Sequence, residues 1–227
     1  FFEKFNHIAS AVRHPLRLRN FTLPIISLLS GKSGTMALEE VFGDQRIENL
    51  KKLFFCISCN INAAEEHVHT TGLLWRALRA SSSLPGLIPP MVIDGHLHVD
   101  GGVINNFPVD IMKMRLDGLG HVIGANVTSM RDPEARYQFP PYITFWDGLR
   151  HKLGLKKNKY HFPAPYETLL TSLLMGSTDR IVHNIQHTDT LIQPKKIKYG
   201  QLITVKDPER YIEMGYKIAM KALKQEK

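Results

Sequence analysis

The stretch from Ile93 to Asp110, IDGHLHVDGGVINNFPVD, constrains the fold more than any other part of the chain. Its first Asp-Gly pair, Asp94-Gly95, separates two short apolar segments, and Asp-Gly is a preferred two-residue turn between antiparallel strands. PPMVIDGHLHVDGG is therefore predicted to form a β-hairpin with Asp94-Gly95 as its turn. A second Asp-Gly step directly follows HLHVD and is predicted to end that strand.

A helix is predicted to begin at the end of this stretch. The sequence Asn-Asn-x-Pro contains two residues that can cap a helix, Asn105 and Asn106, and Pro108 suits the first helical turn. The helix is expected to continue to the glycines near residues 118–120. The whole stretch thus predicts a strand, a tight turn and a helix in immediate succession.

Strands and helices alternate along the rest of the chain, as is typical of a layered α/β domain. Further strands are predicted over 50–61, 66–71, 121–127 and 190–194. Further helices are predicted over 1–20, 36–44, 72–81, around 142–153, over 166–187, and from 208 onward with Asp207 as its cap. We expect one domain over 1–227, in which 1–128 form the core and 129–227 an irregular basic segment followed by C-terminal helices.

Composition places the chain among folded globular proteins and adds one charged feature. Hydrophobic residues make up 43% and charged residues 22%, and the formal net charge is +8. Segment 150–159 is rich in Lys and Arg and contains no acid. Such a segment can contact anionic lipid at about 1 kcal/mol per basic residue near the surface, or remain a solvated loop. No nucleic-acid-binding signature accompanies it, so nucleic acid is not expected as a partner.

The two cysteines, Cys56 and Cys59, form a CxxC pair inside the apolar run LFFCISCNI. In a strand, residues three apart point to opposite faces, and zinc would need two further ligands. Two buried, reduced thiols are therefore favoured over a redox or zinc site, which agrees with a cytosolic compartment.

The HxH triplet, His96 and His98, raises the alternative of a metal site. On a strand these histidines could share a face with Asp94 and Asp100, and PGLIPPMVIDGHLHV resembles the first-strand HxH of amidohydrolases. That barrel takes about 250 residues, more than remain after Asp100. Hydrogen-bonded strand histidines are the favoured interpretation, and neither a metal nor a cofactor is predicted.

The run RASSSLPGLIPPMVIDGHLHVDGGVINNFPVD closely resembles the second half of the patatin-like phospholipase domain. That pattern is a helix ending RAS-x-S-x-PG, an apolar segment with two prolines, and a strand ending in DGG before NN-x-P. The resemblance is greatest to the neuropathy-target-esterase branch. It extends to LPIISLLSGK, FGD-x-x-IE-x-L, the FFC strand, the GLLWRALRAS helix, VIGANV and TLIQP, and so covers almost the whole chain.

The resemblance implies a three-layer α/β/α domain with a central, mostly parallel sheet, here incomplete at its N-terminal side. It also implies a Ser–Asp dyad without histidine, in which Asp100 is the general base. Such a base needs a fixed place at a strand end and partial burial to raise its basicity. Gly101 and Gly102 are expected to let the backbone turn beneath the substrate, and Asn105 and Asn106 to tie the turn to the next helix.

The serine of this dyad is not found in the sequence. The family's nucleophile lies in GxSxG on a strand-to-helix turn, and no such motif occurs here. GKSGT over 31–35 lacks the final glycine, and Ser81, Ser82 and Ser83 lie at a helix end that is structural in the family. We therefore expect the sequence to be the C-terminal part of a longer protein and to be inactive alone.

Two functional hypotheses follow from this resemblance. In the first, the parent protein is an esterase that hydrolyses phospholipids or lysophospholipids, with this chain supplying the base. In the second, it is a non-catalytic pseudoenzyme that binds lipid or a partner protein. A cytoplasmic or peripheral-membrane location is expected, with membrane contact through 150–159. No apolar run approaches the roughly 18 residues that a membrane-spanning helix needs.

Overall fold

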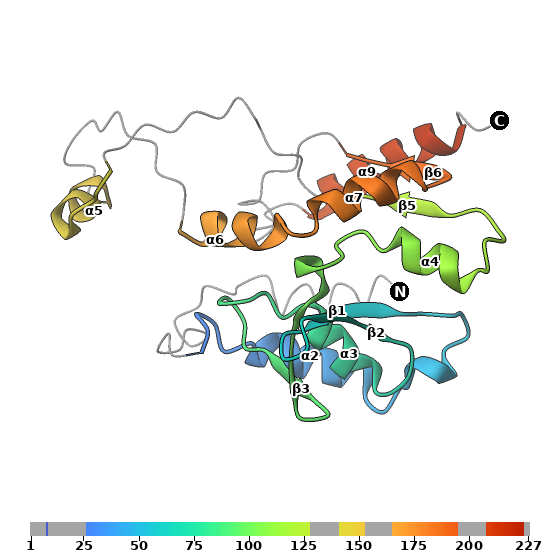
Figure 1. Cartoon of the computed structure of the whole chain (residues 1–227), viewed down its shortest axis with the longest axis horizontal. Helices are drawn as coiled ribbons and strands as arrows, with labels where there is room; N and C mark the ends of the chain where they lie inside the picture. The colour runs from blue at the N-terminus through green and yellow to red at the C-terminus, as the bar shows by residue number, and fades with distance from the viewer. Residues whose placement is uncertain (1–7, 9–25, 128–140, 153–164, 195–207, 225–227) are drawn as a thin grey trace.

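The structure is a computed structural model, and it describes residues 8, 26–127, 141–152, 165–194 and 208–224 (Figure 1). Three predictions fall largely or wholly outside these residues. They are the helix over 1–20, of which only residue 8 is described, the Asp207 cap, and the basic segment 150–159, of which only residues 150–152 are described. Strands and helices both occur, so the mixed α/β class is confirmed.

Four antiparallel strands form the larger sheet, in the order β2-β1-β4-β3. Their bounds are β1 Cys56–Asn60, β2 Glu65–His69, β3 Met91–Ile93 and β4 His96–Asp100. The predicted hairpin is confirmed, because β3 and β4 pair directly across Asp94 and Gly95. Both turn residues have positive φ, 50° and 80°, as a two-residue turn of this hand requires.

Helices α2, Lys32–Phe42, and α3, Leu74–Ser81, pack against each other, and α3 also contacts strands of this sheet. The core here consists of Ile47, from the short helix η2 Ile47–Asn49, with Leu74 and Ala77 of α3. The helical spacing of GLLWRALRAS buries one face of α3, as predicted. The helix predicted at 36–44 begins earlier, at Lys32.

A second group of elements lies beyond β4, in the upper half of Figure 1. It contains a parallel strand pair, β5 Ile123–Ala125 and β6 Thr190–Ile192, together with several helices. The helices are α4 Val109–Arg115, α6 Pro165–Leu174, α7 Thr178–Gln186 and α9 Pro208–Lys224, while α5, Phe145–Lys152, lies apart from them. Phe107, Val109, Val122 and Ile181 form a separate apolar core for this group.

The expected central, mostly parallel sheet is wrong for the described residues, where the larger sheet is wholly antiparallel and only β5 and β6 pair in parallel. Short turns dictate the antiparallel pairing of β1 with β2 and of β3 with β4, since a parallel connection needs a crossover of a dozen or more residues. Strand β1 also pairs antiparallel with β4, which follows it only after α3. Strand β5 is also shorter than predicted and is not covered on both faces, because Ile123 is 52% exposed.

Two helix predictions also require correction. The pattern over 166–187 forms two helices, α6 and α7, with a break between Leu174 and Thr178. The helix after the hairpin begins at Val109 with Pro108 at its N-cap position, and no side chain caps it. Asn105 and Asn106 therefore do not cap α4, and Asn105 has a different role described below.

Candidate functional site

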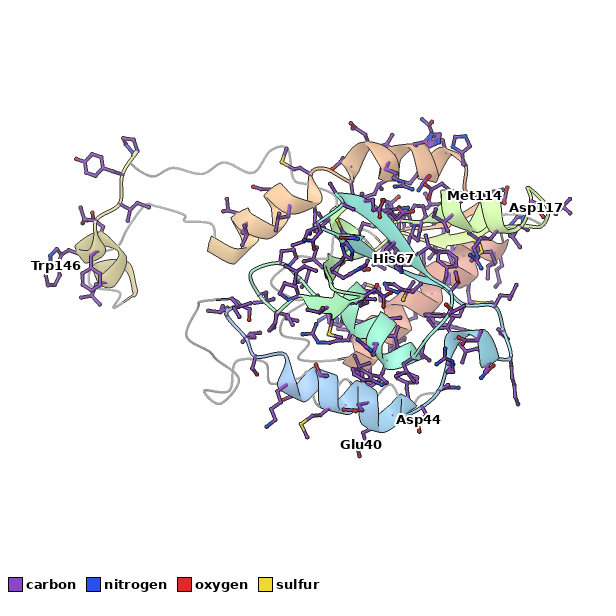
Figure 2. All side chains as sticks on the ribbon, turned by 60° about the horizontal axis from the view of Figure 1, so that its bottom comes forward. Glu40, Asp44, His67, Met114, Asp117 and Trp146 are labelled. Carbon is purple, nitrogen blue, oxygen red and sulfur yellow. The ribbon has the colours of Figure 1, made fainter. Side chains whose placement is uncertain are left out.

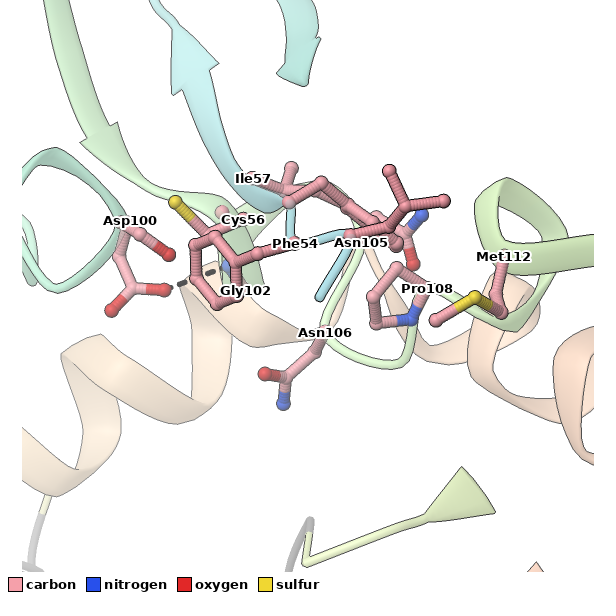
Figure 3. A pocket seen from close by; sticks show the side chains of 13 residues that line it. Phe54, Cys56, Ile57, Asp100, Gly102, Asn105, Asn106, Pro108 and Met112 are labelled. Atoms are coloured by element: carbon pink, nitrogen blue, oxygen red, sulfur yellow. Dashed lines mark hydrogen bonds between the residues drawn. The ribbon is translucent and has the colours of Figure 1, made fainter. Parts of the chain in front are cut away.

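Asp100 lies at the end of β4 in a pocket of about 430 Å³ between the two groups of elements (Figure 3). Gly101, Gly102, Asn105 and Asn106 line the same pocket, so the five residues singled out in the sequence lie together. The rest of the lining is largely apolar: Leu53, Phe54, Phe55, Ile57, Pro108 and Met112. The pocket thus combines one carboxyl group with an apolar wall.

The backbone of Asp100 is fixed on both sides. It lies opposite Ser58 of β1, and its N–H donates to the Ser83 carbonyl oxygen at 2.9 Å. Its Oδ1 accepts a hydrogen bond from the Gly102 N–H at 2.7 Å. Within the described part of the chain, no group donates to Oδ2. One carboxylate oxygen is therefore held by the turn, and the other is available to a reactant.

Burial makes Asp100 an unusually basic carboxyl group. Desolvation raises its pKa to about 6, although the Gly102 hydrogen bond acts in the opposite direction. A carboxylate with such a pKa remains largely ionised at neutral pH and accepts a proton more readily than a solvent-exposed aspartate. This property is what a general base requires.

Gly101 makes a close contact with backbone, and Gly102 makes close contacts with side chains. A Cβ on Gly101 would lie 2.3 Å from the Ile57 carbonyl oxygen, so the turn after β4 presses against the backbone of β1. A Cβ on Gly102 would lie 2.9 Å from Asn106 Oδ1 and 3.0 Å from Asp100 Oδ1. Substrate access was the reason expected from the sequence. The structure adds a second reason for Gly101, which lets the turn pack on β1, and shows that Gly102 leaves room for the Asn106 and Asp100 side chains.

Asn105 lines the pocket, and it also ties the turn to neighbouring elements. Its N–H donates to the Gly101 carbonyl oxygen at 2.8 Å, closing the short helix η3, Gly101–Val103. Its side-chain amide donates to Glu66 Oε2 at 3.0 Å and to Asp110 Oδ1 at 3.1 Å. Asn106 faces the pocket (Figure 3).

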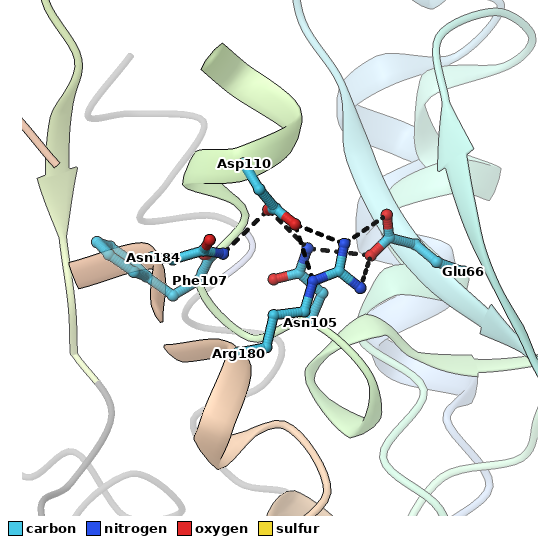
Figure 4. Close-up of polar contacts among 6 residues, drawn as sticks. All are labelled: Glu66, Asn105, Phe107, Asp110, Arg180 and Asn184. Atoms are coloured by element: carbon cyan, nitrogen blue, oxygen red, sulfur yellow. Dashed lines mark hydrogen bonds and ion pairs between the residues drawn. The ribbon is translucent and has the colours of Figure 1, made fainter. Parts of the chain in front are cut away.

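Sequence reasoning missed the groups that surround Asn105: Glu66, Asp110, Arg180 and Asn184 (Figure 4). Asp110 is the last residue of the stretch from Ile93 to Asp110. An acidic residue suits the first turn of a helix, so there was no reason in the sequence to assign Asp110 a further role. Arg180 and Glu66 are 114 positions apart, so no local spacing could have paired them.

The two histidines of HxH have separate environments. His96 is exposed, whereas His98 is 2% exposed and its Nδ1 lies 2.8 Å from Ser58 Oγ. The same hydroxyl lies 2.7 Å from His69 Nε2. Burial lowers the pKa of both rings, that of His69 to about 4, so both are neutral at physiological pH. In the described part of the chain, no three His, Cys, Asp or Glu side chains are arranged to hold a metal ion.

The other candidate residues have structural surroundings. Ser83 Oγ donates to the Arg79 carbonyl oxygen at 2.8 Å, and Ser82 Oγ to that of Leu78 at 2.9 Å. Ser81 lines the pocket and hydrogen-bonds Cys56. Ser33, in GKSGT, lies within helix α2 and not on a strand-to-helix turn.

Both cysteines are free thiols. Cys59 is buried and Cys56 is half-buried, and burial raises the pKa of Cys56 to about 12. Because the thiolate is the reactive form, this environment disfavours nucleophilic or redox chemistry at Cys56.

Comparison with known proteins places these features in a family. Residues 8–113 match the family model described as patatin-like phospholipase. The chain is 40% identical over 121 residues to the neuropathy target esterase sws of Drosophila melanogaster, covering 52% of this chain and 8% of that protein. It is 38% identical over 115 residues to a lysophospholipase of Candida albicans, covering 51% and 8%.

A longer match covers most of the chain. An uncharacterized NTE family protein of Mycobacterium tuberculosis is 30% identical over 206 residues, which is 91% of this chain and 35% of that protein. The chain therefore spans about a third or less of the length of these relatives. The matched residues 8–113 include Asp100, Gly101, Gly102 and Asn105, and the chain belongs to the patatin-like phospholipase family, with homologues among the neuropathy-target-esterase-related proteins.

Proposed function

We propose that this chain supplies the general base of a serine esterase that hydrolyses acyl esters of lysophospholipids or phospholipids. The main support for this proposal is the half-buried Asp100 carboxylate, which has its pKa raised to about 6 and lies in a largely apolar pocket. A serine outside this sequence would be the nucleophile, within one patatin-like domain that includes residues 1–227. The lysophospholipase among the relatives supports this substrate class.

The chemistry assigned to Asp100 is proton transfer. As the serine oxygen attacks the ester carbonyl carbon, the free Oδ2 takes the hydroxyl proton, and it then returns that proton to the departing alcohol. Water then attacks the acyl-enzyme, and Asp100 takes a proton from the water and returns it to the serine oxygen as the fatty acid is released. Meanwhile Oδ1 remains hydrogen-bonded to the Gly102 N–H, which keeps the carboxylate oriented through both steps.

The apolar wall of the pocket suits the acyl chain of such a substrate. Leu53 lines the pocket and is 96% exposed, so its apolar surface can contact a ligand. Met112 of α4 contributes a flexible thioether side chain to the same lining. Burial of each CH₂ against such a wall contributes about 0.8 kcal/mol. The pocket is therefore expected to favour esters of long acyl chains over esters of short acyl chains.

The test is covalent labelling of the full-length gene product by a fluorophosphonate, together with lysophosphatidylcholine turnover. We expect labelling at a serine outside this sequence and release of fatty acid; the 227-residue chain alone should give neither. A full-length protein that neither labels nor turns over lysophospholipid would contradict the proposal and favour the pseudoenzyme hypothesis.

We further propose that helix α5 and the basic segment 150–159 contact the membrane surface that presents the substrate. Four large apolar side chains are exposed over five positions, namely Tyr142 at 74%, Ile143 at 49%, Phe145 at 77% and Trp146 at 64%. In Figure 2, Trp146 points away from the rest of the chain. Exposed aromatics beside clustered Lys and Arg are typical of helices that lie in a bilayer interface. No helix among the described residues has the length and apolar character to cross a bilayer.

Vesicle binding tests this contact. The double substitution Phe145→Ala with Trp146→Ala is expected to weaken binding to phosphatidylcholine/phosphatidylserine vesicles about tenfold or more, because two interfacial anchors are lost. Tyr216→Ala is the matched control, since Tyr216 is a similarly exposed aromatic, at 66%, on α9. Equal cosedimentation of the double variant and the wild type would contradict the assignment.

A further inference from the structure

Arg180 of α7 joins the two groups of elements on either side of the pocket (Figure 4). Its Nη1 lies 2.9 Å from Glu66 Oε2 on β2. Its Nη2 and Nε lie 2.6 and 2.8 Å from Asp110 Oδ2 on α4. One guanidinium thus bridges the antiparallel sheet, which carries Asp100, and the helices of the second group.

The turn that follows Asp100 is attached to the same two carboxylates. Asn105 donates to both Glu66 and Asp110 through one amide nitrogen. Through its backbone it also closes the turn onto Gly101. A continuous series of contacts therefore runs from Arg180 through the carboxylates and Asn105 to the residue next to Asp100.

This arrangement depends on the positive charge. Glu66 and Asp110 approach the same guanidinium and the same amide, and Arg180 lowers the pKa of Asp110. Without Arg180, two carboxylates would face one amide group. Their repulsion would separate β2 from α4, which are the two elements that hold Asn105.

The arrangement also leaves polar atoms unsatisfied. Asn105 and Asn184 both turn their amide nitrogens toward Asp110, and Asn184 also donates to the Phe107 carbonyl oxygen. In the described part of the chain, the buried carbonyl oxygens of both amides accept no hydrogen bond. Such a group costs about 1–3 kcal/mol, so this network is better suited to fixing positions than to maximising stability.

We propose that Arg180 is a positioning residue for Asp100, and that it acts through Asn105 and the Gly101–Gly102 turn. This inference rests on the proposed esterase function and extends it to a residue outside the matched residues 8–113. Arg180 touches neither the pocket nor the reacting atoms. Arg180 holds β2 and α4 at a fixed separation by contacting Glu66 and Asp110.

The experiment compares Arg180→Met and Arg180→Lys in the full-length protein. Arg180→Met is expected to lower kcat about tenfold or more with little change in KM, because a displaced base affects the transition state more than substrate binding. Arg180→Lys should recover only part of the loss, since an ammonium cannot contact both carboxylates as a planar fork does. Adding methylguanidinium to Arg180→Ala should recover part of kcat as well.

Lys113→Met is the matched control. It removes a similar partly exposed ion pair, Lys113 Nζ to Asp189 Oδ2 at 2.5 Å, that lies within the second group only. We expect an unchanged kcat and a smaller loss of stability than in Arg180→Met, because Lys113 contacts one carboxylate and Arg180 contacts two. If both variants lower kcat equally, or if neither does, Arg180 has no positioning role.

Hydrogen–deuterium exchange across residues 100–106 separates this inference from the proposed function. In folded Arg180→Met, amide exchange in this segment should accelerate about tenfold or more, whereas in Lys113→Met it should match the wild type. Unchanged exchange in Arg180→Met would overturn the positioning role whatever the activity. Absence of turnover in the wild type would instead refute the esterase function and leave the exchange result valid.

Discussion

Asp100→Asn is expected to lower kcat of the proposed full-length esterase by roughly 10³-fold, in the middle of the range of about 10²- to 10⁴-fold for loss of a general base. An amide of nearly the same shape can still occupy the pocket and still accept the Gly102 hydrogen bond through its carbonyl oxygen. It cannot take the serine proton. KM for lysophosphatidylcholine should therefore change little, and steady-state hydrolysis is the measurement.

The pH dependence of kcat/KM provides the second signature of this base. The carboxylate is the active form, so activity should be present above the pKa of Asp100 and fall as pH drops through about 6. In Asp100→Asn, the residual activity should lack this acid limb. Wild-type activity that remains constant from pH 7 to pH 5 would contradict the assignment of Asp100.

The same substitution should not weaken the fold. Because burial raises the folded-state pKa of Asp100 from its ordinary value of 3.8 to about 6, its contribution to stability is largest below about pH 4 and is lost as pH rises through about 6. At neutral pH the buried charge is a cost that Asn removes. We therefore expect the Tm of Asp100→Asn at pH 7.5 to equal or exceed that of the wild type, which excludes unfolding as the cause of lost activity.

Gly101→Ala should impair both stability and activity. The added Cβ would lie 2.3 Å from the carbonyl oxygen and 2.7 Å from the carbonyl carbon of Ile57, and backbone atoms cannot rotate away as a side chain can. Relieving this overlap requires the turn to move away from β1, at a cost of about 1–3 kcal/mol. A displacement of about 1 Å can lower a rate by up to about 100-fold, so we expect kcat to fall between 10- and 100-fold.

Gly215→Ala is the control for Gly101→Ala. Gly215 lies inside α9, and a Cβ there would meet nothing within 4 Å. The replacement should raise helix stability by up to about 1 kcal/mol and leave kcat unchanged. Denaturant unfolding and steady-state kinetics of the two variants give the comparison, and a Gly101→Ala protein with wild-type kcat would show that the turn tolerates displacement.

Local patterns in the sequence predicted the features that depend on neighbouring residues. Asp94-Gly95 determines a hairpin because the turn alone brings β3 and β4 together, and the helical spacing in α3 follows from its own buried face. The placement of Asp100 at a strand end follows from the same hairpin. Family resemblance, rather than any pattern, underlies the proposal that the second Asp-Gly step carries chemistry.

Features that depend on distant partners could not be predicted in this way. Arg180 contacts Glu66 only because α7 packs beside α4 in the folded chain, and nothing near either residue in sequence indicates the other. The antiparallel order β2-β1-β4 depends on β1 pairing with a strand that follows α3. Likewise, Asn105 looked like a helix cap by local rules, but two carboxylates from other elements orient its amide instead.

The Ser58 hydroxyl that links His69 to His98 has a single proton, so it can donate to only one of the two imidazoles and must accept from the other. The tautomers of the two rings are therefore coupled, and the ring nitrogens of His98 have distinct magnetic environments as long as the strands stay in register. His98 lies two residues before Asp100 on β4. Its imidazole resonances thus offer a spectroscopic probe of the strand that carries Asp100, and they can be measured in every variant even when no ester is turned over.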